Sequence, residues 1–187
     1  MYKNQIEFLK KITNYFPNAL FFSTGSEFFL RISFEENWNI LYFLKNFSYA
    51  LFKQLIDLSF IDYPERKYRF ELFYNLLSLR YNSRLTVITA VSEDQYVDSV
   101  TSIYPAAGWY EREAWDMFGV FFRNHPDLRR MLTDYGFKGH PMRKDFPMTG
   151  YIEVRYDDFN KRIAYEEVSL AQEYRVFSLE NNWGSAK

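Results

Sequence analysis

The sequence predicts an α+β fold: a largely antiparallel sheet with flanking helices, followed by a long extended C-terminal arm. Apolar runs of the strand type dominate residues 19–91, and one dense helical pattern follows at 105–118. From 123 to 158 no regular period survives, and prolines and glycines recur. Strands followed by a helix are typical of an α+β domain with antiparallel pairing. We therefore predict a domain at 1–119 and an arm at 120–187 that packs on partner proteins.

The first predicted elements are a helix, a hairpin and a second helix. Residues 2–16 carry a helical stripe, and the apolar runs 19–22 and 28–34 flank a turn at Gly25. Ser33 is a residue type that caps helices, and two glutamates follow it where the helix dipole favours negative charge. The helix that begins there would carry Trp38, Leu41, Tyr42 and Lys45.

Three strands are expected after the second helix. Residues 50–62 are apolar-rich, 66–79 alternate between apolar and polar side chains, and 84–91 are rich in β-branched residues. A turn at 81–83 joins the last two strands, which we expect to pair. One face of the middle strand would hold Tyr68, Phe70, Leu72, Tyr74 and Leu76, and the other Lys67, Arg69, Glu71 and Asn75.

The helix expected at 105–118 has suitable residues at both ends. Pro105 suits the first helical position, and Gly119 suits the left-handed position after the last turn. Arg112 and Asp116 are four residues apart, so we expect them to pair, which is worth about 0.2–0.5 kcal/mol. The apolar stripe of this helix would hold Ala106, Tyr110, Ala114 and Met117.

The stretch after this helix is unusual for a loop. Long loops without a period are uncommon in compact domains and are usually functional or disordered. Single aromatic residues such as Tyr135, Phe137 and Phe146 stand among its charges, whereas disordered segments are poor in aromatics. The arm could lie on its own domain or on a partner. Alternating apolar anchors and charges favour a partner protein.

The composition excludes several classes of function. A formal net charge of -1 provides no basic field for nucleic acid or an anionic membrane surface. The chain has no cysteine, which excludes disulfides, thiolate zinc sites, cysteine nucleophiles and cysteine-ligated iron–sulfur clusters. Its apolar runs are shorter than the roughly 20 residues of a spanning helix. We expect no cofactor in this chain, no nucleic acid partner and no direct membrane span.

Three carboxylates, Glu111, Glu113 and Asp116, form the densest group of residues that could carry chemistry. Glu113 and Asp116, together with His125, could hold a hard cation or act as acid and base, as in a stand-alone metal-dependent enzyme. Carboxylate spacing alone is weak evidence, and neither His125 nor His140 lies in an HExxH pattern. We favour a buried network in which basic side chains neutralise the carboxylates.

Residues 111–132 read EREAWDMFGVFFRNHPDLRRML. This stretch resembles the signature of the 30-kDa subunit family of respiratory NADH:quinone oxidoreductase (complex I). The resemblance continues through 132–158, back through 62–84, and again at 170–177. The signature positions that match are Glu111, Arg112, Glu113, Asp116, Met117, Phe118, His125, Arg129, Met131 and Leu132.

The resemblance implies a non-catalytic subunit in the quinone-reducing module of the hydrophilic arm. Such a subunit would pack against the large quinone-site subunit and its iron–sulfur neighbours. FMN and iron–sulfur clusters would lie in those neighbouring subunits, which pass electrons from NADH to ubiquinone coupled to proton translocation. The expected partner contacts are Glu111, Arg112, Glu113, Asp116, His125, Arg129, Arg130, Tyr135, Phe137, Arg143 and Phe146, with ion pairs from the four arginines and apolar anchors from the three aromatic residues.

The resemblance also bears on the compartment. The stretch LTDYGFKGHP at 132–141 is similar to the mitochondrial and related bacterial branch. Phe (20) and Tyr (16) outnumber Gly (7) and Pro (6), as A/T-rich codons would produce, and no Arg-rich presequence opens the chain. We expect the matrix side of the mitochondrial inner membrane, with the bacterial cytoplasmic side as an alternative. The equivalent subunit of a membrane-bound hydrogenase or a plastid-type complex is the other alternative.

Overall fold

The computed structural model describes residues 15–25 and 27–177, so most of the helix expected at 2–16 lies outside the described residues. The chain divides into two compact units, Met1–Phe146 and Pro147–Lys187, and each is described by itself. The first unit contains β1 (Leu20–Thr24), β2 (Glu27–Ile32), η1 (Phe34–Glu36), α2 (Asn37–Asn46), β3 (Gln54–Asp62), β4 (Phe70–Ser78), β5 (Ser83–Val91), β6 (Tyr96–Asp98), α3 (Ala107–Phe118) and β7 (Phe121–Arg123).

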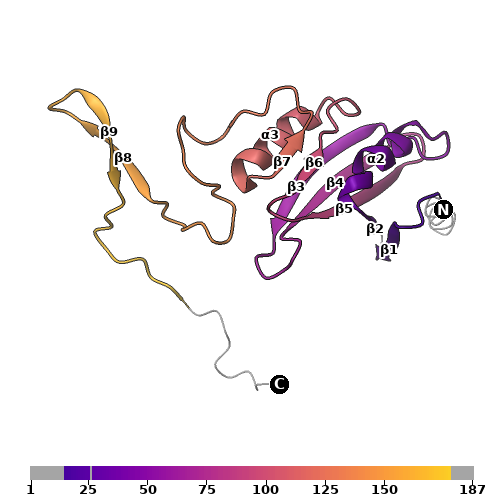
Figure 1. The fold of residues 1–187 in the computed structure, drawn as a ribbon, viewed down its shortest axis with the longest axis horizontal. Helices are drawn as coiled ribbons and strands as arrows, with labels where there is room; N and C mark the ends of the chain where they lie inside the picture. Colours follow the sequence, from indigo (N-terminus) through magenta and orange to yellow (C-terminus); the bar gives the residue numbers. More distant parts are fainter. Residues whose placement is uncertain (1–14, 26, 178–187) are drawn as a thin grey trace, which may run out of the picture. The chain divides into compact units, whose positions relative to one another are not determined.

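The main sheet has five strands in the order β1-β2-β5-β4-β3 (Figure 1). The α+β class is confirmed, but the sheet is mixed, because β2 runs parallel to β5 while the other three pairs are antiparallel. Local sequence patterns reveal hairpins, whereas the β2–β5 pair joins strands that α2, β3 and β4 separate along the chain. No local signal specifies such a pair, so the sequence alone did not predict the one parallel pairing of this sheet.

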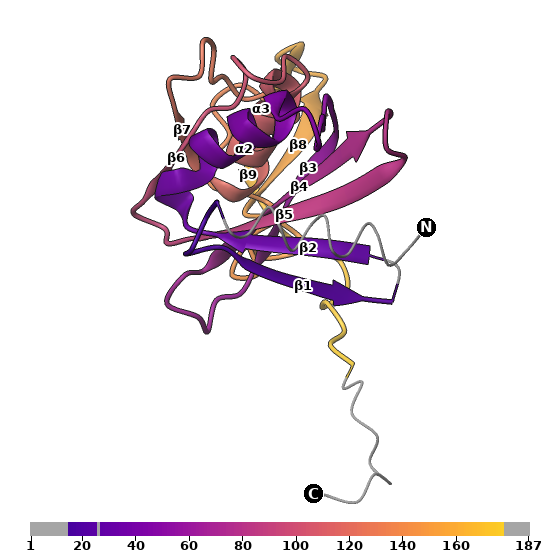
Figure 2. The ribbon, with the colours of Figure 1, turned by 90° about the vertical axis from the view of Figure 1, so that its right-hand side faces the viewer.

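Both helices cover the same face of the sheet (Figure 2). From α2, Asn37 donates a hydrogen bond of 2.7 Å to the hydroxyl of Tyr74 on β4. From α3, the ring of Phe118 lies with its centroid 6.4 Å from that of Phe70, on the same face of β4. Residues from both helices and from β2 to β5 therefore share one apolar core. Burial of this core supplies the main stabilisation of the unit.

The helix boundaries confirm one predicted cap and correct two others. Gly119 adopts the left-handed conformation after α3, as predicted. Ser33 precedes the short helix η1 but its side chain makes no capping bond, and α2 begins only at Asn37. Pro105 lies before α3, which begins at Ala107. Helix ends are set by tertiary contacts as well as residue type, so shifts of one or two residues are expected.

The second unit contains a hairpin of β8 (Ile152–Asp157) and β9 (Arg162–Glu167). The prediction of no regular period at 123–158 is wrong for β8, whose sequence IEVRYD alternates apolar and charged residues in strand fashion. Val154 faces Tyr165 across the hairpin, and Glu153 faces Glu166. No residue from 147 to 177 is buried. The described part of this unit therefore has no core of its own.

The predicted domain boundary at residue 119 stays a prediction about which part folds alone. Contacts place the division of the chain after Phe146. Val120 and Phe122 are buried in the core of the first unit, and β7 pairs with β6. A truncation that separates the units therefore belongs after Phe146, since a cut after Gly119 would remove core residues.

Candidate docking site

The segment that follows β7 is held against the end of α3. The last carbonyl groups of a helix have no partner within the helix, so another part of the chain must satisfy them. Here residues 140–143 do so. His140 Nδ1 donates to the carbonyl of Asp116 at 3.0 Å, Met142 N–H to Met117 at 3.1 Å, and Arg143 Nε to Phe118 at 2.6 Å.

Gly119 lies directly beneath these caps. Its φ is +78°, a value that side chains disfavour. A Cβ atom at this position would lie 2.5 Å from Nε2 of His140 and 2.7 Å from Nη2 of Arg143. Only glycine lets both side chains approach the end of α3 this closely.

Asp116 holds a second part of the same segment. Its carboxylate is fully buried and accepts hydrogen bonds from three successive backbone N–H groups, at Met131, Leu132 and Thr133. The Thr133 hydroxyl donates at 2.6 Å, and Arg130 Nη1 donates at 3.0 Å. Burial by itself would raise the pKa of Asp116, but the bonds from Thr133 and its neighbours hold that pKa well below the usual range. Asp116 is therefore an ionised anchor.

The predicted pair of Arg112 with Asp116 does not form. The Arg112 guanidinium instead donates to the carbonyls of Arg129 and Arg130, at 3.1 and 3.5 Å. Both residues thus bind the same distant segment rather than each other. Helical spacing brought them to one side of α3, but backbone groups fifteen or more residues later compete for them.

A third anchor ties the end of the segment to the sheet. Asp62 on β3 accepts two bonds from Arg69, at 2.7 and 2.9 Å, and one from the backbone N–H of Lys144 at 2.7 Å. Arg69 also pairs with Asp145 at 2.9 Å, and Arg143 pairs with Glu93. Residues 143–145 therefore lie against their own unit.

Glu111 and His125 lie together in a separate buried cluster. Glu111 Oε2 accepts a bond of 2.6 Å from Ser99, and Oε1 accepts one of 2.8 Å from the Val100 N–H. His125 Nε2 lies 3.9 Å from Glu111 Oε2. Burial raises the pKa of Glu111 to about 7, although the bonds from Ser99 and Val100 oppose that shift.

The expected site residues fall into three groups. Glu111, Asp116, His125, Arg130 and Arg143 are engaged inside the chain. A basic side chain, Arg130, neutralises Asp116, whereas Ser99 and the Val100 N–H bind Glu111 and Glu113 is exposed, so the favoured network forms at one carboxylate of the three. Others are exposed: Tyr135 has an exposed fraction of 102%, Leu132, a matching signature position, has 57%, and Met142, which the sequence analysis did not name, has 55%. That any of them contacts a partner stays a prediction. The exposed set is Glu113, Arg129, Leu132, Tyr135 and Met142, and the half-buried set is Arg112, Phe137 and Phe146.

The metal-enzyme alternative finds no support in this geometry. Among the described residues, no group of three or more His, Asp or Glu side chains converges as metal ligands would. Glu113 is exposed, while the oxygens of Asp116 are occupied by the segment from Arg130 to Thr133. His125 lies beside Glu111 instead.

No helix within residues 15–25 and 27–177 has the length and apolar character of a membrane span.

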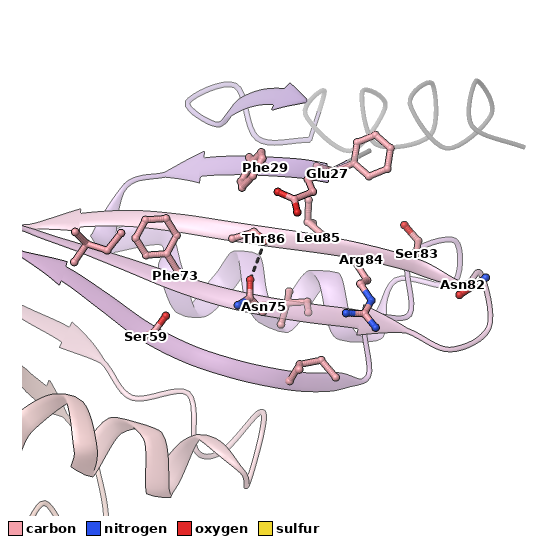
Figure 3. Close-up of a pocket in the computed structure, with 14 residues that line it drawn as sticks. Glu27, Phe29, Ser59, Phe73, Asn75, Asn82, Ser83, Arg84, Leu85 and Thr86 are labelled. Atoms are coloured by element: carbon pink, nitrogen blue, oxygen red, sulfur yellow. Dashed lines mark hydrogen bonds between the residues drawn. The ribbon is translucent and has the colours of Figure 1, made fainter. Parts of the chain in front are cut away.

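The face of the sheet opposite the helices bears a shallow hollow of about 740 Å³. Figure 3 shows Phe29 and Phe73 along it, with Thr86 donating a hydrogen bond of 2.9 Å to Asn75 at its centre. The charged side chains among its lining residues are Glu27 and Arg84. This lining does not offer the paired carboxylates or histidine that acid–base catalysis uses.

A family model supports the resemblance that the sequence suggested. Residues 30–152 match the model described as "Respiratory-chain NADH dehydrogenase, 30 Kd subunit". The matched range leaves out β1 and the first half of β2, and includes β3, β4 and β5, both described α-helices and the anchored segment at 130–146. The match therefore covers the structural parts that hold the candidate site.

Curated relatives are similar over most of their length. "NADH-ubiquinone oxidoreductase subunit 9" of Reclinomonas americana is 51% identical over 178 residues, which is 95% of this chain and 86% of the relative. "NADH dehydrogenase [ubiquinone] iron-sulfur protein 3" of Arabidopsis thaliana is 57% identical over 146 residues, 78% of this chain and 77% of the relative. Despite the second name, the present chain has no cysteine with which to ligate a cluster.

A solved structure is similar in fold. It is described as the membrane-bound sulfane sulfur reductase, an archaeal respiratory membrane complex. One of its chains aligns with a TM-score of 0.68 and 26% identity, over 78% of this chain and 86% of that one. The family match and the relatives above 50% identity agree with each other. The chain therefore belongs to the 30-kDa subunit family of the respiratory-chain NADH dehydrogenase.

Proposed function

We propose that this chain is a non-catalytic structural subunit in the peripheral arm of complex I, where it braces the quinone-reducing module. The structural role rests on one observation: the described part of the second unit exposes many apolar side chains and has no buried residue. The electron carriers, FMN and iron–sulfur clusters, would lie in neighbouring subunits. The closer identity to NADH dehydrogenase relatives than to the sulfane sulfur reductase chain favours complex I over a related respiratory complex.

The hairpin of the second unit has one apolar face and one charged face. Residues that alternate along a strand share a face, and directly paired residues do so as well. The charged face holds an ion pair between Arg155 and Glu166 at 2.7 Å. The other face ends at Glu167, which pairs with Ile152, and its apolar side chains are all exposed: Ile152, Val154, Tyr156, Ile163 and Tyr165.

A two-stranded hairpin is marginally stable in water unless its apolar face packs on something. Exposed apolar side chains also recur beyond the strands, at Met148, Phe159 and Phe177. Contiguous apolar surfaces of this kind mark protein interfaces. A partner subunit that covers the apolar face would supply the missing core.

The first unit holds the stretch of chain that leads into the second unit. Asp116 fixes residues 130–133, the caps on α3 fix 140–143, and Asp62 fixes Lys144. The second unit begins shortly afterwards at Pro147. We propose that the anchored segment, with Tyr135 exposed on it, and the hairpin bind the large quinone-site subunit and its iron–sulfur neighbours. The proposed location is the matrix side of the mitochondrial inner membrane.

Replacing Val154 and Tyr165 together with serine tests this role. These two residues face each other across the hairpin on its apolar face. We expect the variant chain to keep its folded first unit, because neither residue lies in that unit's core. It should fail to join the large complex that oxidises NADH, as seen on a native gel of mildly solubilised membranes stained for NADH oxidation.

The matched control replaces Glu153 and Glu166 with glutamine, on the charged face one position away. The control should assemble at the normal level, because rim and solvent-facing charges contribute little to affinity. Normal assembly of the serine variant would show that the apolar face binds no partner. Loss of assembly in both variants would point to a need for the hairpin fold itself.

A further inference from the structure

The Glu111–His125 cluster lies just before the anchored segment at 130–146. The proposed binding of partner subunits does not explain why these two residues are buried together. The exposed fractions of the two side chains are 0% and 2%. Glu111 is on α3, His125 follows β7, and Ser99 follows β6. Three stretches of the chain therefore converge on one buried carboxyl group.

The hydrogen bonds of His125 fix its protonation state. Its Nδ1 accepts a bond of 3.0 Å from the backbone N–H of Asp127, so Nδ1 carries no proton. Its Nε2 therefore carries the proton and donates to the carbonyl of Gly108 at 3.2 Å. The ring is a neutral imidazole in this arrangement, and a second proton on Nδ1 would break the bond from Asp127.

Nε2–H of His125 has two acceptors within reach. The carbonyl of Gly108 lies at 3.2 Å and Oε2 of Glu111 at 3.9 Å. A carboxylate is a stronger acceptor than a carbonyl, whereas a protonated carboxyl group is not. The charge on Glu111 therefore decides which acceptor the ring prefers.

Other titratable and charged groups face this cluster from the surrounding elements. Burial chiefly raises the pKa of Tyr74 on β4, and the charges of Glu111 and of Asp98 on β6 raise it further. Asp98 pairs with Arg123 of β7 at 2.6 Å. The hydrogen bond from Arg129 chiefly lowers the pKa of Asp127, and Arg112 of α3 lowers it further. None of these groups changes charge near neutral pH at its ordinary pKa. Glu111 is then the group of this cluster whose charge changes there, because burial raises its pKa to about 7.

The proton on Glu111 has a route to solvent. Ser99 bonds Glu111 Oε2 at 2.6 Å, and its hydroxyl lies 2.9 Å from that of Thr101. Ser99 and Thr101 both line a hollow of about 400 Å³ on the surface of the first unit. A chain of two hydroxyls therefore links the buried carboxyl group to water.

We propose that Glu111 and His125 form a proton-dependent switch at the root of the anchored segment. In the acid form, the Glu111 Oε2–H donates to Ser99, and His125 Nε2–H stays on Gly108. In the base form, Glu111 has released one proton to solvent through Ser99, the Ser99 hydroxyl donates to Oε2, and His125 Nε2–H turns to Oε2. No proton moves onto the histidine in either state.

The switch has a defined mechanical consequence. The bond from Asp127 to Nδ1 persists in both forms, so the 125–127 turn moves with the ring. The turn shifts away from Gly108 on alkalinisation and toward Oε2 of Glu111, which Ser99 also binds. Residues 128–133 follow directly in the chain, so this shift would change their hydrogen bonds with Arg112 and Asp116.

Nitrogen-15 NMR of the two histidine rings in the full-length chain tests the proposal. The chain has two histidines, and a His140→Gln variant, which keeps an N–H donor, assigns the signals. Across the step, Nδ1 of His125 should keep accepting the bond from the Asp127 N–H, with the ring proton on Nε2. Its Nε2–H signal and the Val100 amide signal should shift together with one midpoint near that of Glu111. In Glu111→Gln this shared step should vanish.

Two results would overturn the switch. A doubly protonated His125 ring at the acid end would show an ordinary histidine titration. Separate midpoints for Val100 and His125, or no step at either, would show that Glu111 does not control the ring. Because the coincidence of midpoints is measured in the unaltered chain, the test stands even if Glu111→Gln fails to fold.

Discussion

Replacing Gly119 with alanine is expected to lower the free energy of unfolding by about 3–5 kcal/mol. A residue with a Cβ atom in the left-handed conformation costs about 1–2 kcal/mol by itself. The new Cβ would also lie 2.5 Å from His140 and 2.7 Å from Arg143, so both side chains must move. Their bonds to the carbonyls of α3 would then be lost, at about 1 kcal/mol or more each.

Gly136 provides a matched control, because it has a similar φ of +74° with nothing within 4 Å of the position that a Cβ would occupy. Gly136→Ala should cost only the conformational part, about 1–2 kcal/mol. Urea-induced unfolding of the full chain, followed by fluorescence, measures both values. Equal losses in the two variants would mean that the close approach of His140 and Arg143 contributes nothing.

Replacing Asp116 with alanine should cost a similar amount, about 3–5 kcal/mol. Removing one partner of a buried ion pair leaves the other charge unpaired, which typically costs this much. Here the loss would strand Arg130, the Thr133 hydroxyl and three backbone N–H groups. The segment 130–133 should detach, which hydrogen exchange of its amides would reveal. Protection of those amides equal to that in the unaltered chain would contradict the anchoring role.

Glu113→Ala is the control on the same helix, since Glu113 is an exposed carboxylate three residues earlier. Its effect should be within about 0.5 kcal/mol. The two carboxylates also differ in acid. The pKa of Asp116 is lowered by folding, so its contribution is complete above the ordinary value of 3.8 and is lost as pH falls through the lower folded value. Asp116→Asn should remove that part of the acid sensitivity.

Much of the fold could be predicted because its signals are local. Alternation marked β4, β-branched residues marked β5, and Gly119 marked the end of α3. The parallel pairing of β2 with β5 could not be predicted, since it depends on a contact between distant strands. The β8 strand could have been found from the alternation of IEVRYD, but the surrounding prolines and glycines obscured it.

The sequence predicted several residues of the site but not the groups that they bind. Asp116 and Arg130 both belonged to the expected set, yet spacing within one helix suggested Arg112 as the partner of Asp116. The actual bonds of Asp116 reach backbone groups at 131–133, and backbone donors leave no trace in residue types. The close approach of His140 to Gly119 could not be predicted either, because it depends on the path of the chain between these two residues.

The parallel neighbour of β2 also affects how the chain is made. Phe29 pairs in register with Thr86, and 86 − 29 gives a separation of 57 residues. Ribosomes add roughly 5–20 residues per second, so the β1–β2 hairpin waits about 3–11 s before β5 is synthesised. During that time one edge of β2 is open, with its apolar side chains uncovered. We expect nascent chains arrested before β5 to bind chaperones, and chains arrested after β5 to release them.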